Sequence, residues 1–415
     1  GLSTAWLATT LLLHADVTVS PLFSSHAVLQ RDQEIAIWGG ASDGEKVSVS
    51  LGKARQATVA QDGKWRVTFP ARPASKKGVT LTINGNNKIV IDDILIGDVW
   101  VASGQSNMER QLGPRQGQQE LVGWREEAAK ANYPLLRQFA VPHSMSYLPQ
   151  SEANGNWSVC TPETAPSFTA VGYYFARDIQ QHLDIPVGIL FSSWGGTMIE
   201  SWISEKGLAT QPKQLPFLQN NQVARTNNLA PNKPNTQAVL YNAMIAPLQG
   251  FAIKGVIWYQ GESNRERPNE YRDLLATMVS DWREAWKQPK LPFLYVQVAP
   301  FNNMTPLIRE AQLQALPLIQ PGAMVVTIDV GDAKDIHPTH KEPVGQRLAL
   351  AARAVAYGEK IAYQGPELLS LQVTNRVAKL KFAHVGKGLQ ARDGALRGFI
   401  LSLIHISEPT RPRLI

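Results

Sequence analysis

The amino-acid sequence predicts an α/β protein with a central parallel sheet, preceded by a small antiparallel β-domain and followed by the start of a second β-module. Residues 16–95 alternate apolar and polar positions, with turn signals between the runs. From Gly97 the period changes, and helical stretches alternate with short apolar runs. That alternation is typical of a parallel sheet with both faces covered by helices. After Gly365, strand-and-turn sequence returns.

Length and composition agree with several folded units. With 415 residues, 44% of them hydrophobic, the chain is long enough for two or three domains with their own cores. The 41 Lys and Arg outnumber the 34 Asp and Glu, but they are scattered and form no stripe that could follow phosphates, so we expect no nucleic-acid partner. The single cysteine, Cys160, has no intramolecular disulfide partner, so we expect a free, inert thiol.

The two ends of the chain carry distinct signals. Residues 1–15, GLSTAWLATTLLLHA, form a short apolar run that ends in a small residue, as do the core and cleavage site of a secretory signal. We therefore expect a partial signal peptide and a secreted or periplasmic protein without membrane contact after cleavage; the alternative is a buried first strand or helix. Residues 401–415, which include LSLIHISEPTR, resemble a translated transposase sequencing adapter, and we expect them to be a read-through artefact.

Residues 16–95 are predicted to form the N-terminal β-domain. The run QATVAQDGKWRVTF contains the hairpin signal Asp62-Gly63, and VTLTINGNNKIVI contains Asn84-Gly85. Both dipeptides favour tight turns between alternating strands.

Residues 96–362 are predicted to form the parallel-sheet domain, and residues 363–400 a truncated β-module. The helical stretches are VGYYFARDIQQHL, EYRDLLATMVSDWREAW and PVGQRLALAARAVA. Four apolar runs end abruptly in polar or glycine residues: GDVWVAS before GQSN, VGILF before SSWGGT, GVIWY before QGESN, and AMVVTIDV before GDAKDIHP. Parallel strands deliver their carboxyl ends to one edge, so we expect these four loops to meet.

The loops contain the groups of an acyl-transfer site. Ser106 supplies a hydroxyl, and His337 supplies a base that could remove its proton. Asp335 could orient the imidazole, and Asp332 is the alternative carboxylate. Ser106 also fits a capping box with Glu109, an alternative that is compatible with catalysis because a helix N-terminus favours a developing anion.

Other residues near these motifs have several interpretations. The backbone N–H groups of Gly195-Gly196 suit an oxyanion hole, and Gln260 or Asn264 could add an amide donor. His337, His340 and Glu342 could approach a metal ion, but the sequence lacks the H-E-x-x-H spacing, so we expect no metal.

Four of these motifs together indicate a family. GQSNM, SWGGTMIESW, WYQGESN and DIHPTHKEPVGQRLAL resemble the sialate O-acetylesterase family of the SGNH (GDSL-type) hydrolases, carbohydrate esterases that deacetylate sugars. SPLFSSHAVLQRD and LYNAMIAPL also resemble members of that family, and the similarity spans residues 16–400. The G-x-S-x-G elbow of ordinary α/β-hydrolases is absent at Ser106. The resemblance implies an SGNH-type three-layer sandwich.

The resemblance also implies site residues. It makes Ser106 the nucleophile, His337 the base and Asp335 the orienting acid. Gly196 and Gln260 become oxyanion donors. The predicted substrate-binding residues, and a further tryptophan that could stack on a sugar ring, are Gln105, Glu262, Trp194, Trp258 and Trp202; for the tryptophans the alternative is packing.

The chain departs from the family pattern at two positions. Lys334 stands where the superfamily commonly has its Asp, three residues before the histidine, and Ser263 stands where an Asn is usual. The expected activity is an esterase that needs no cofactor and removes O-acetyl groups from sugars, with sialic acid esters as substrate. The alternatives are acetylxylan or another plant glycan as substrate, and a carbohydrate-binding protein without turnover.

Overall fold

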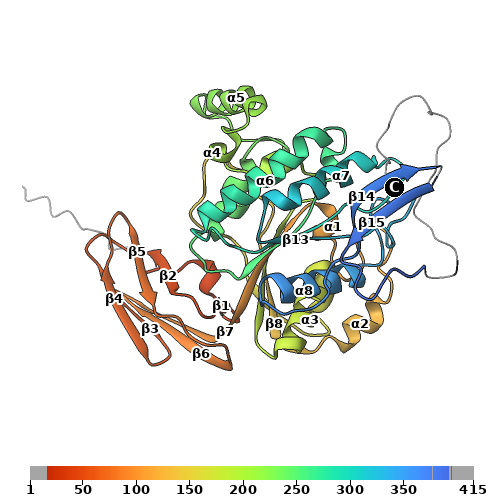
Figure 1. Cartoon of the computed structure of the whole chain (residues 1–415). Helices are drawn as coiled ribbons and strands as arrows, with labels where there is room; N and C mark the ends of the chain where they lie inside the picture. Colours follow the sequence, from red (N-terminus) through yellow and green to blue (C-terminus); the bar gives the residue numbers. More distant parts are fainter. Residues whose placement is uncertain (1–15, 376, 392–393, 395–415) are drawn as a thin grey trace, which may run out of the picture.

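A computed structural model describes residues 16–375, 377–391 and 394 of the chain (Figure 1). The predicted signal peptide and the predicted artefact at residues 401–415 lie outside the described residues. Among the described residues, none of the helices combines the length and the apolar character needed to cross a bilayer.

The central sheet runs in the order β13-β12-β11-β7-β10-β8-β9. Every neighbouring pair is parallel except β8 and β9. The strands are β7 (Lys88–Gly104), β8 (Tyr133–Ala140), β9 (Trp157–Cys160), β10 (Val187–Ser193), β11 (Gly255–Tyr259), β12 (Phe293–Val296) and β13 (Gly322–Val325).

Alternate residues of these strands face two separate cores, as the pleat of a β-strand requires. In β7, Val99 and Val101 belong to one core, whereas Trp100 and Ala102 belong to the other. Helices α6 (Pro268–Ala285) and α7 (Pro306–Ala315) close the first core, and α3 (Ala170–Leu183) and α8 (Glu342–Val355) close the second. Figure 1 shows the two pairs on opposite sides of the sheet. The predicted α/β fold is confirmed.

The N-terminal strands form an antiparallel region, as predicted. They are β2 (Ile35–Gly40), β3 (Lys46–Leu51), β4 (Ala54–Val59), β5 (Lys64–Phe69) and β6 (Ser75–Asn84), whereas the short strand β1 (Val28–Gln30) pairs parallel with β7. Strands β6 and β7 form the predicted hairpin around Asn84-Gly85. Strand β7 then continues without interruption into the central sheet, so the predicted boundary at residue 95 falls inside one strand.

The second predicted hairpin is wrong in its pairing. Asp62 and Gly63 adopt the positive φ angles of a tight turn, +52° and +72°. Gln61 and Lys64 pair antiparallel across this turn, as a hairpin requires, but the strands beyond that bridge separate, because β4 pairs with β3 and β5 pairs with β2. Alternate residues of β5 are buried, Trp65, Val67 and Phe69 among them, so β5 packs its apolar face in the core from a different sheet. The local sequence is enough to form the turn, whereas tertiary packing decides which strand pairs with β5.

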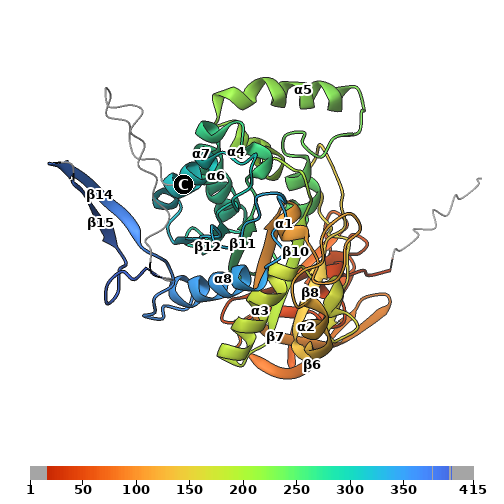
Figure 2. The same cartoon turned by 90° about the vertical axis from the view of Figure 1, so that its right-hand side faces the viewer.

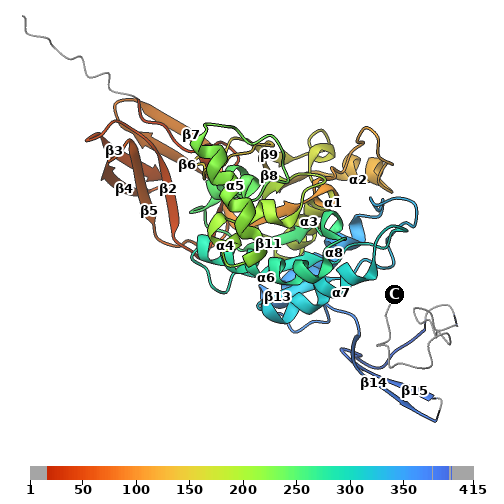
Figure 3. The same cartoon turned by 90° about the horizontal axis from the view of Figure 1, so that it is seen from above.

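The other helices, strands and short turns complete the fold. The α-helices and strands are α1 (Ser106–Glu109), α2 (Trp124–Lys130), α4 (Glu205–Leu208), α5 (Leu215–Thr226), β14 (Glu367–Thr374) and β15 (Val377–Ala383). Short 3-10 turns cover Pro21–Phe23, Ala165–Ser167, Ile199–Trp202, Pro212–Gln214, Ala246–Leu248, Glu262–Asn264 and Leu316–Leu318, and a π-turn covers Tyr241–Ile245. The β14–β15 hairpin stands away from the body in Figure 2, at the end opposite the N-terminal strands in Figure 3.

Candidate active site

The four predicted loops meet at one edge of the central sheet. The strands that carry them end at Gly104, Ser193, Tyr259 and Val325. The Gln105 N–H donates to the Tyr259 carbonyl at 3.0 Å, and the Trp194 N–H donates to the Gly104 carbonyl at 3.1 Å. The fourth run was predicted as a strand to residue 330, but β13 ends at Val325 and residues 326–330 already belong to the loop.

Ser106 is the first residue of the single-turn helix α1. The chain reaches it through Gly104, which has a φ of +141° and lies so close to β11 that a Cβ there would meet the Tyr259 carbonyl oxygen at 2.1 Å. Only glycine fits this approach. The hydroxyl of Ser106 is partly exposed and caps no backbone amide, since the N-cap position belongs to Gln105. The predicted capping box is therefore wrong.

Glu109, the acidic partner of that predicted box, orders the neighbouring glycine turn instead. Its carboxylate accepts a hydrogen bond from the Gly195 N–H at 2.9 Å and pairs with Arg115 at 2.9 Å and with His143 at 3.0 Å. Burial opposes ionisation, but the hydrogen bonds from His143 and Arg115 outweigh it and lower the pKa of Glu109 below its usual value. A charged carboxylate thus holds Gly195 against Ser106. The approach is so close that a Cβ added to Gly195 would lie 3.2 Å from the Cβ of Ser106.

Gly196 occupies the exposed side of the same turn. It has a φ of +74°, and a Cβ there would point into open space. Asn235 secures the turn: its side chain donates to the Gly196 carbonyl at 3.1 Å and accepts from the Met198 N–H at 2.7 Å. With Gly195 N–H already bonded to Glu109, the Gly196 N–H is the amide of this pair that remains for a substrate oxygen.

His337 lies in the loop after β13 with Asp335 beside it. The Asp335 Oδ1 accepts the His337 backbone N–H at 2.8 Å and lies 3.5 Å from the ring Nδ1. The Gln119 amide donates to the other carboxylate oxygen at 3.1 Å. Asp332 is exposed and accepts the Lys334 N–H at 2.8 Å within its own turn. The geometry therefore favours Asp335 over Asp332 as the carboxylate that orients the imidazole.

The surroundings keep His337 neutral near pH 7. Burial, the charge of Lys341 and two arginines, Arg115 and Arg110, lower the pKa of His337, and Asp335 opposes them. A neutral imidazole can accept a proton, as a general base must.

Asn107, which the sequence analysis did not single out, joins the serine loop to the histidine loop. It is fully buried, and its amide donates to the Ile336 carbonyl at 3.0 Å and to Glu262 Oε1 at 2.6 Å. Because Asn107 follows Ser106 and Ile336 precedes His337, this contact brings the two predicted catalytic residues into the same site. The sequence feature that could have identified Asn107 is its position in the GQSN motif.

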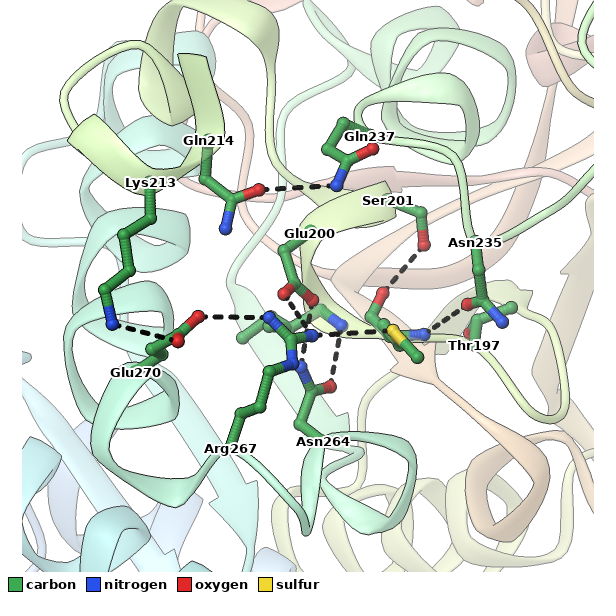
Figure 4. A network of polar contacts seen from close by, with 12 residues as sticks. Thr197, Glu200, Ser201, Lys213, Gln214, Asn235, Gln237, Asn264, Arg267 and Glu270 are labelled. Carbon is green, nitrogen blue, oxygen red and sulfur yellow. Dashed lines mark hydrogen bonds and ion pairs between the residues drawn. The ribbon is translucent and has the colours of Figure 1, made fainter. Parts of the chain in front are cut away.

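The side-chain amide of Gln260, predicted as an oxyanion donor, donates to two groups of the protein. Gln260 is completely buried, and its side-chain amide donates to the Thr197 carbonyl at 3.1 Å and to Asn264 Oδ1 at 2.7 Å. The alternative donor, Asn264, is also buried and donates to Glu200 at 2.9 Å. Figure 4 shows Asn264 and Arg267 side by side, both in contact with Glu200, and Arg267 forms an ion pair with it. These hydrogen bonds hold the loop after β11 in place from its buried side.

Three of the four residues predicted to bind substrate are buried, and their contacts are with the protein itself. Gln105 and Glu262 are each 2% exposed, and Trp258 is 0% exposed. Gln105 Oε1 accepts the Ser263 N–H at 3.2 Å, so it holds backbone rather than ligand. Trp258 packs edge-on against Trp202, which is also buried, and against a third core tryptophan.

Trp194 keeps an exposed part and stacks on another ring at the loop edge. Its ring lies 4.1 Å from that of His143 with the planes 3° apart. His143 was not identified from the sequence, since nothing local links it to the motifs. The pair offers a flat surface of the kind that packs against apolar ligand faces.

The described residues contain no group of three or more His, Cys, Asp or Glu side chains arranged to hold a metal ion. His340 is exposed, and Glu342 pairs with Arg177 at 2.9 Å. The alternative metal site at His337, His340 and Glu342 is therefore not assembled.

Comparisons with known proteins point to the same chemistry. A family model described as carbohydrate esterase, sialic acid-specific acetylesterase, matches residues 96–354. Sialate O-acetylesterase from Mus musculus is 31% identical and aligns over 86% of this chain and 77% of its own length; the Homo sapiens protein is 30% identical over 82% and 71%. A solved carbohydrate acetylesterase from Xanthomonas citri has a TM-score of 0.80 and 37% identity, covering 89% of this chain and 82% of its own.

Proposed function

The chain belongs to the carbohydrate esterase family of sialic acid-specific acetylesterases and is a carboxylic ester hydrolase, and on this premise we propose that Ser106, His337 and Asp335 remove O-acetyl groups from sugars through an acyl-enzyme. The observation that carries this assignment is the hydrogen bond from Asn107 to Ile336, because it joins the neighbours of Ser106 and His337. The alternative of a binding protein without turnover does not fit this family.

The proposed reaction has two steps. Ser106 Oγ attacks the acetyl carbonyl carbon while His337 takes the hydroxyl proton, and His337 then returns that proton to the sugar oxygen as the ester bond breaks. A water molecule next attacks the acetyl-serine, His337 removes its proton, and acetate leaves as the serine hydroxyl is regenerated. Asp335 holds the imidazole and stabilises its protonated form in both steps.

Two backbone amides are proposed to stabilise the tetrahedral oxyanion. The first amides of a helix have no partner inside the helix, so the Ser106 N–H at the start of α1 can donate. The Gly196 N–H comes from the adjacent turn, which Glu109 and Asn235 hold in place. Preorganised donors of this kind act where negative charge develops.

The proposed substrate is an O-acetylated sialic acid, as in the mammalian relatives. Sialic acid carries a carboxylate, and Arg115 presents a guanidinium beside the site with 32% of its side chain exposed. Arginine is well suited to bind carboxylates. The stacked Trp194 and His143 rings are proposed to support the sugar at the same edge.

A neutral acetylated plant glycan, such as acetylxylan, is the second candidate. The carbohydrate acetylesterase from Xanthomonas citri, 37% identical to this chain, is described by carbohydrate alone and not by sialic acid, which keeps a second sugar class as a candidate.

One experiment tests both the mechanism and the substrate. Acetate release is measured on a panel of acetylated sialosides and acetylated xylo-oligosaccharides with the wild type, Ser106→Ala and Arg115→Gln. Ser106→Ala should lose on the order of 10⁴-fold or more in turnover on every substrate while remaining folded. Arg115→Gln should lower kcat/KM more on sialosides than on xylo-oligosaccharides, because the loss of its ion pair with Glu109 affects every substrate and the loss of a carboxylate partner affects sialosides alone. Normal turnover by folded Ser106→Ala refutes the mechanism, and higher wild-type kcat/KM on xylo-oligosaccharides selects the second candidate.

A secreted or periplasmic location is also proposed, from the apolar run at residues 1–15. The mature protein isolated from its source cells should then begin near Asp16. N-terminal sequencing that finds residues 1–15 retained would contradict the proposal.

A further inference from the structure

We propose that a buried cluster of Lys341, Asn107 and Glu262, here named the Lys341 cluster, holds Ser106 and His337 at their working separation and that Lys341 and Glu262 are positioning residues. This inference rests on the proposed catalytic roles of Ser106 and His337. None of the three side chains is more than 2% exposed, so they act through the residues beside them.

The cluster links three of the four site loops. Asn107 belongs to the serine loop, Glu262 to the loop after β11, and Lys341 immediately precedes α8. Asn107 Nδ2 donates both to Glu262 and to the carbonyl of Ile336, next to His337. Asn107 Oδ1 accepts a hydrogen bond from Lys341 Nζ. One amide side chain is thereby fixed from both of its ends.

Lys341 and Glu262 set the orientation of that amide, because Lys341 Nζ donates to its oxygen and Glu262 accepts from its NH₂ group. An ammonium group has donors and no acceptor, so it must face the oxygen of Asn107 and not its NH₂ group. A carboxylate has the opposite requirement, and Glu262 faces the NH₂ group. If either side chain is replaced by an apolar one, the amide can turn over, and the hydrogen bond to Ile336 is lost with it. Lys341 Nζ also lies 5.5 Å from the centre of the Tyr259 ring, a position that favours the cation.

The cluster also acts on His337 through its electric field. The charged groups that influence the pKa of His337 are Lys341, Asp335, Arg115 and Arg110, and Lys341 is the strongest of them. The charges that influence the pKa of Lys341 are those of Glu262, Arg110 and Asp335. Removing the Lys341 charge should therefore raise the pKa of His337, an effect that a purely structural side chain would not have.

Stability alone does not account for these buried charges. Burying two ions costs more than their attraction repays in many proteins, whereas removing one partner of a buried pair is strongly destabilising. Glu262 Oε2 moreover has no hydrogen-bond partner among the described residues. A pair of apolar residues would fill the same space, but it would not set the direction of the Asn107 amide.

The test compares Lys341→Met with Lys254→Met as the matched control. Lys254 also lies over a tyrosine ring, at 4.8 Å from Tyr357, but it precedes β11 at the opposite edge of the sheet. On para-nitrophenyl acetate, Lys341→Met should lower kcat by about 10²-fold with little change in KM, because small misplacement of reacting groups costs about that much. Its acid limb of kcat/KM should move to higher pH. Lys254→Met should match the wild type in both.

A double variant keeps the inference testable if Lys341→Met unfolds. Lys341→Met with Glu262→Leu removes both charges, so it should fold, yet kcat should stay low because the Asn107 amide is no longer directed. Wild-type kcat and an unshifted acid limb in either folded variant overturn the inference. Ser106→Ala is measured alongside: if it is inactive while the Lys341 variants behave as wild type, the inference fails and the proposed function stands, whereas an active Ser106→Ala refutes the proposed function itself.

Discussion

Replacing Asp335 with asparagine should slow turnover strongly, because Asp335 faces the imidazole of His337. The separation of Asp335 Oδ1 and His337 Nδ1 is 3.5 Å, and the two side chains are 22% and 23% exposed. The attraction between the carboxylate and the imidazolium at this distance is about 5 kcal/mol at an effective dielectric constant of about 20 and about 1 kcal/mol in bulk water. Because each 1.4 kcal/mol or so is tenfold in rate, kcat should fall roughly 10-fold to 3000-fold.

The substitution Asp335→Asn should leave the loop in place. The asparagine side chain would keep an oxygen for the His337 backbone N–H, which lies 2.8 Å from Oδ1 in the wild type. The Gln119 amide can turn to present its own oxygen to the new NH₂ group. The loss should therefore appear in kcat and not in KM or in the melting temperature.

Asp332→Asn is the matched control. Asp332 is exposed and bonds only within its own turn among the described residues, so this variant should retain turnover within about twofold, as surface substitutions usually do. Both variants are assayed by steady-state hydrolysis of a soluble acetyl ester. The assignment is refuted if Asp335→Asn turns over like the wild type while Asp332→Asn is slow; if neither is slow, His337 works without a carboxylate partner.

Three further predictions follow from the buried ionisable groups. Burial and Lys341 lower the pKa of His337 from 6.5, so the acid limb of the wild-type kcat/KM profile should lie below that pH, and a limb above it contradicts a base in this environment. Burial lowers the pKa of Lys341 from 10.5 to about 7, so between these pH values the unfolded chain binds more protons than the native protein. The contribution of Lys341 to the free energy of unfolding should therefore rise with pH in this range. Urea titrations at several pH values should show that Lys341→Met removes this rise. Burial raises the pKa of Cys160 to about 12, so a thiol reagent such as DTNB should react slowly with the native protein and fast after denaturation; equal rates would mean that the thiol is accessible.

The architecture and the proposed catalytic residues could be predicted from the amino-acid sequence. The change of period at Gly97 predicted the parallel sheet, because pleat and helix impose different spacings on apolar residues. The polar ends of its apolar runs predicted which loops meet, since parallel strands share one carboxyl edge. Ser106 and His337, far apart in the chain, were paired by that rule, and the contact between their neighbours Asn107 and Ile336 agrees with it.

Which neighbouring side chains face the site depends on the packing of the whole molecule. Trp258 lies near the end of β11, and Gln260 and Glu262 follow in the next loop, yet all three are buried. Helix α6 and the adjacent loops pack over them, and the local sequence carries no sign of that packing. For Lys341 the local sequence misleads in the same way, because lysine is ordinarily a surface residue. Its burial depends on partners in two loops that are distant in sequence. A side chain's residue type and spacing are local properties, but its burial and its hydrogen-bond partners are set by segments remote in sequence. At this site those remote contacts decide which groups can touch substrate and which groups hold them in place.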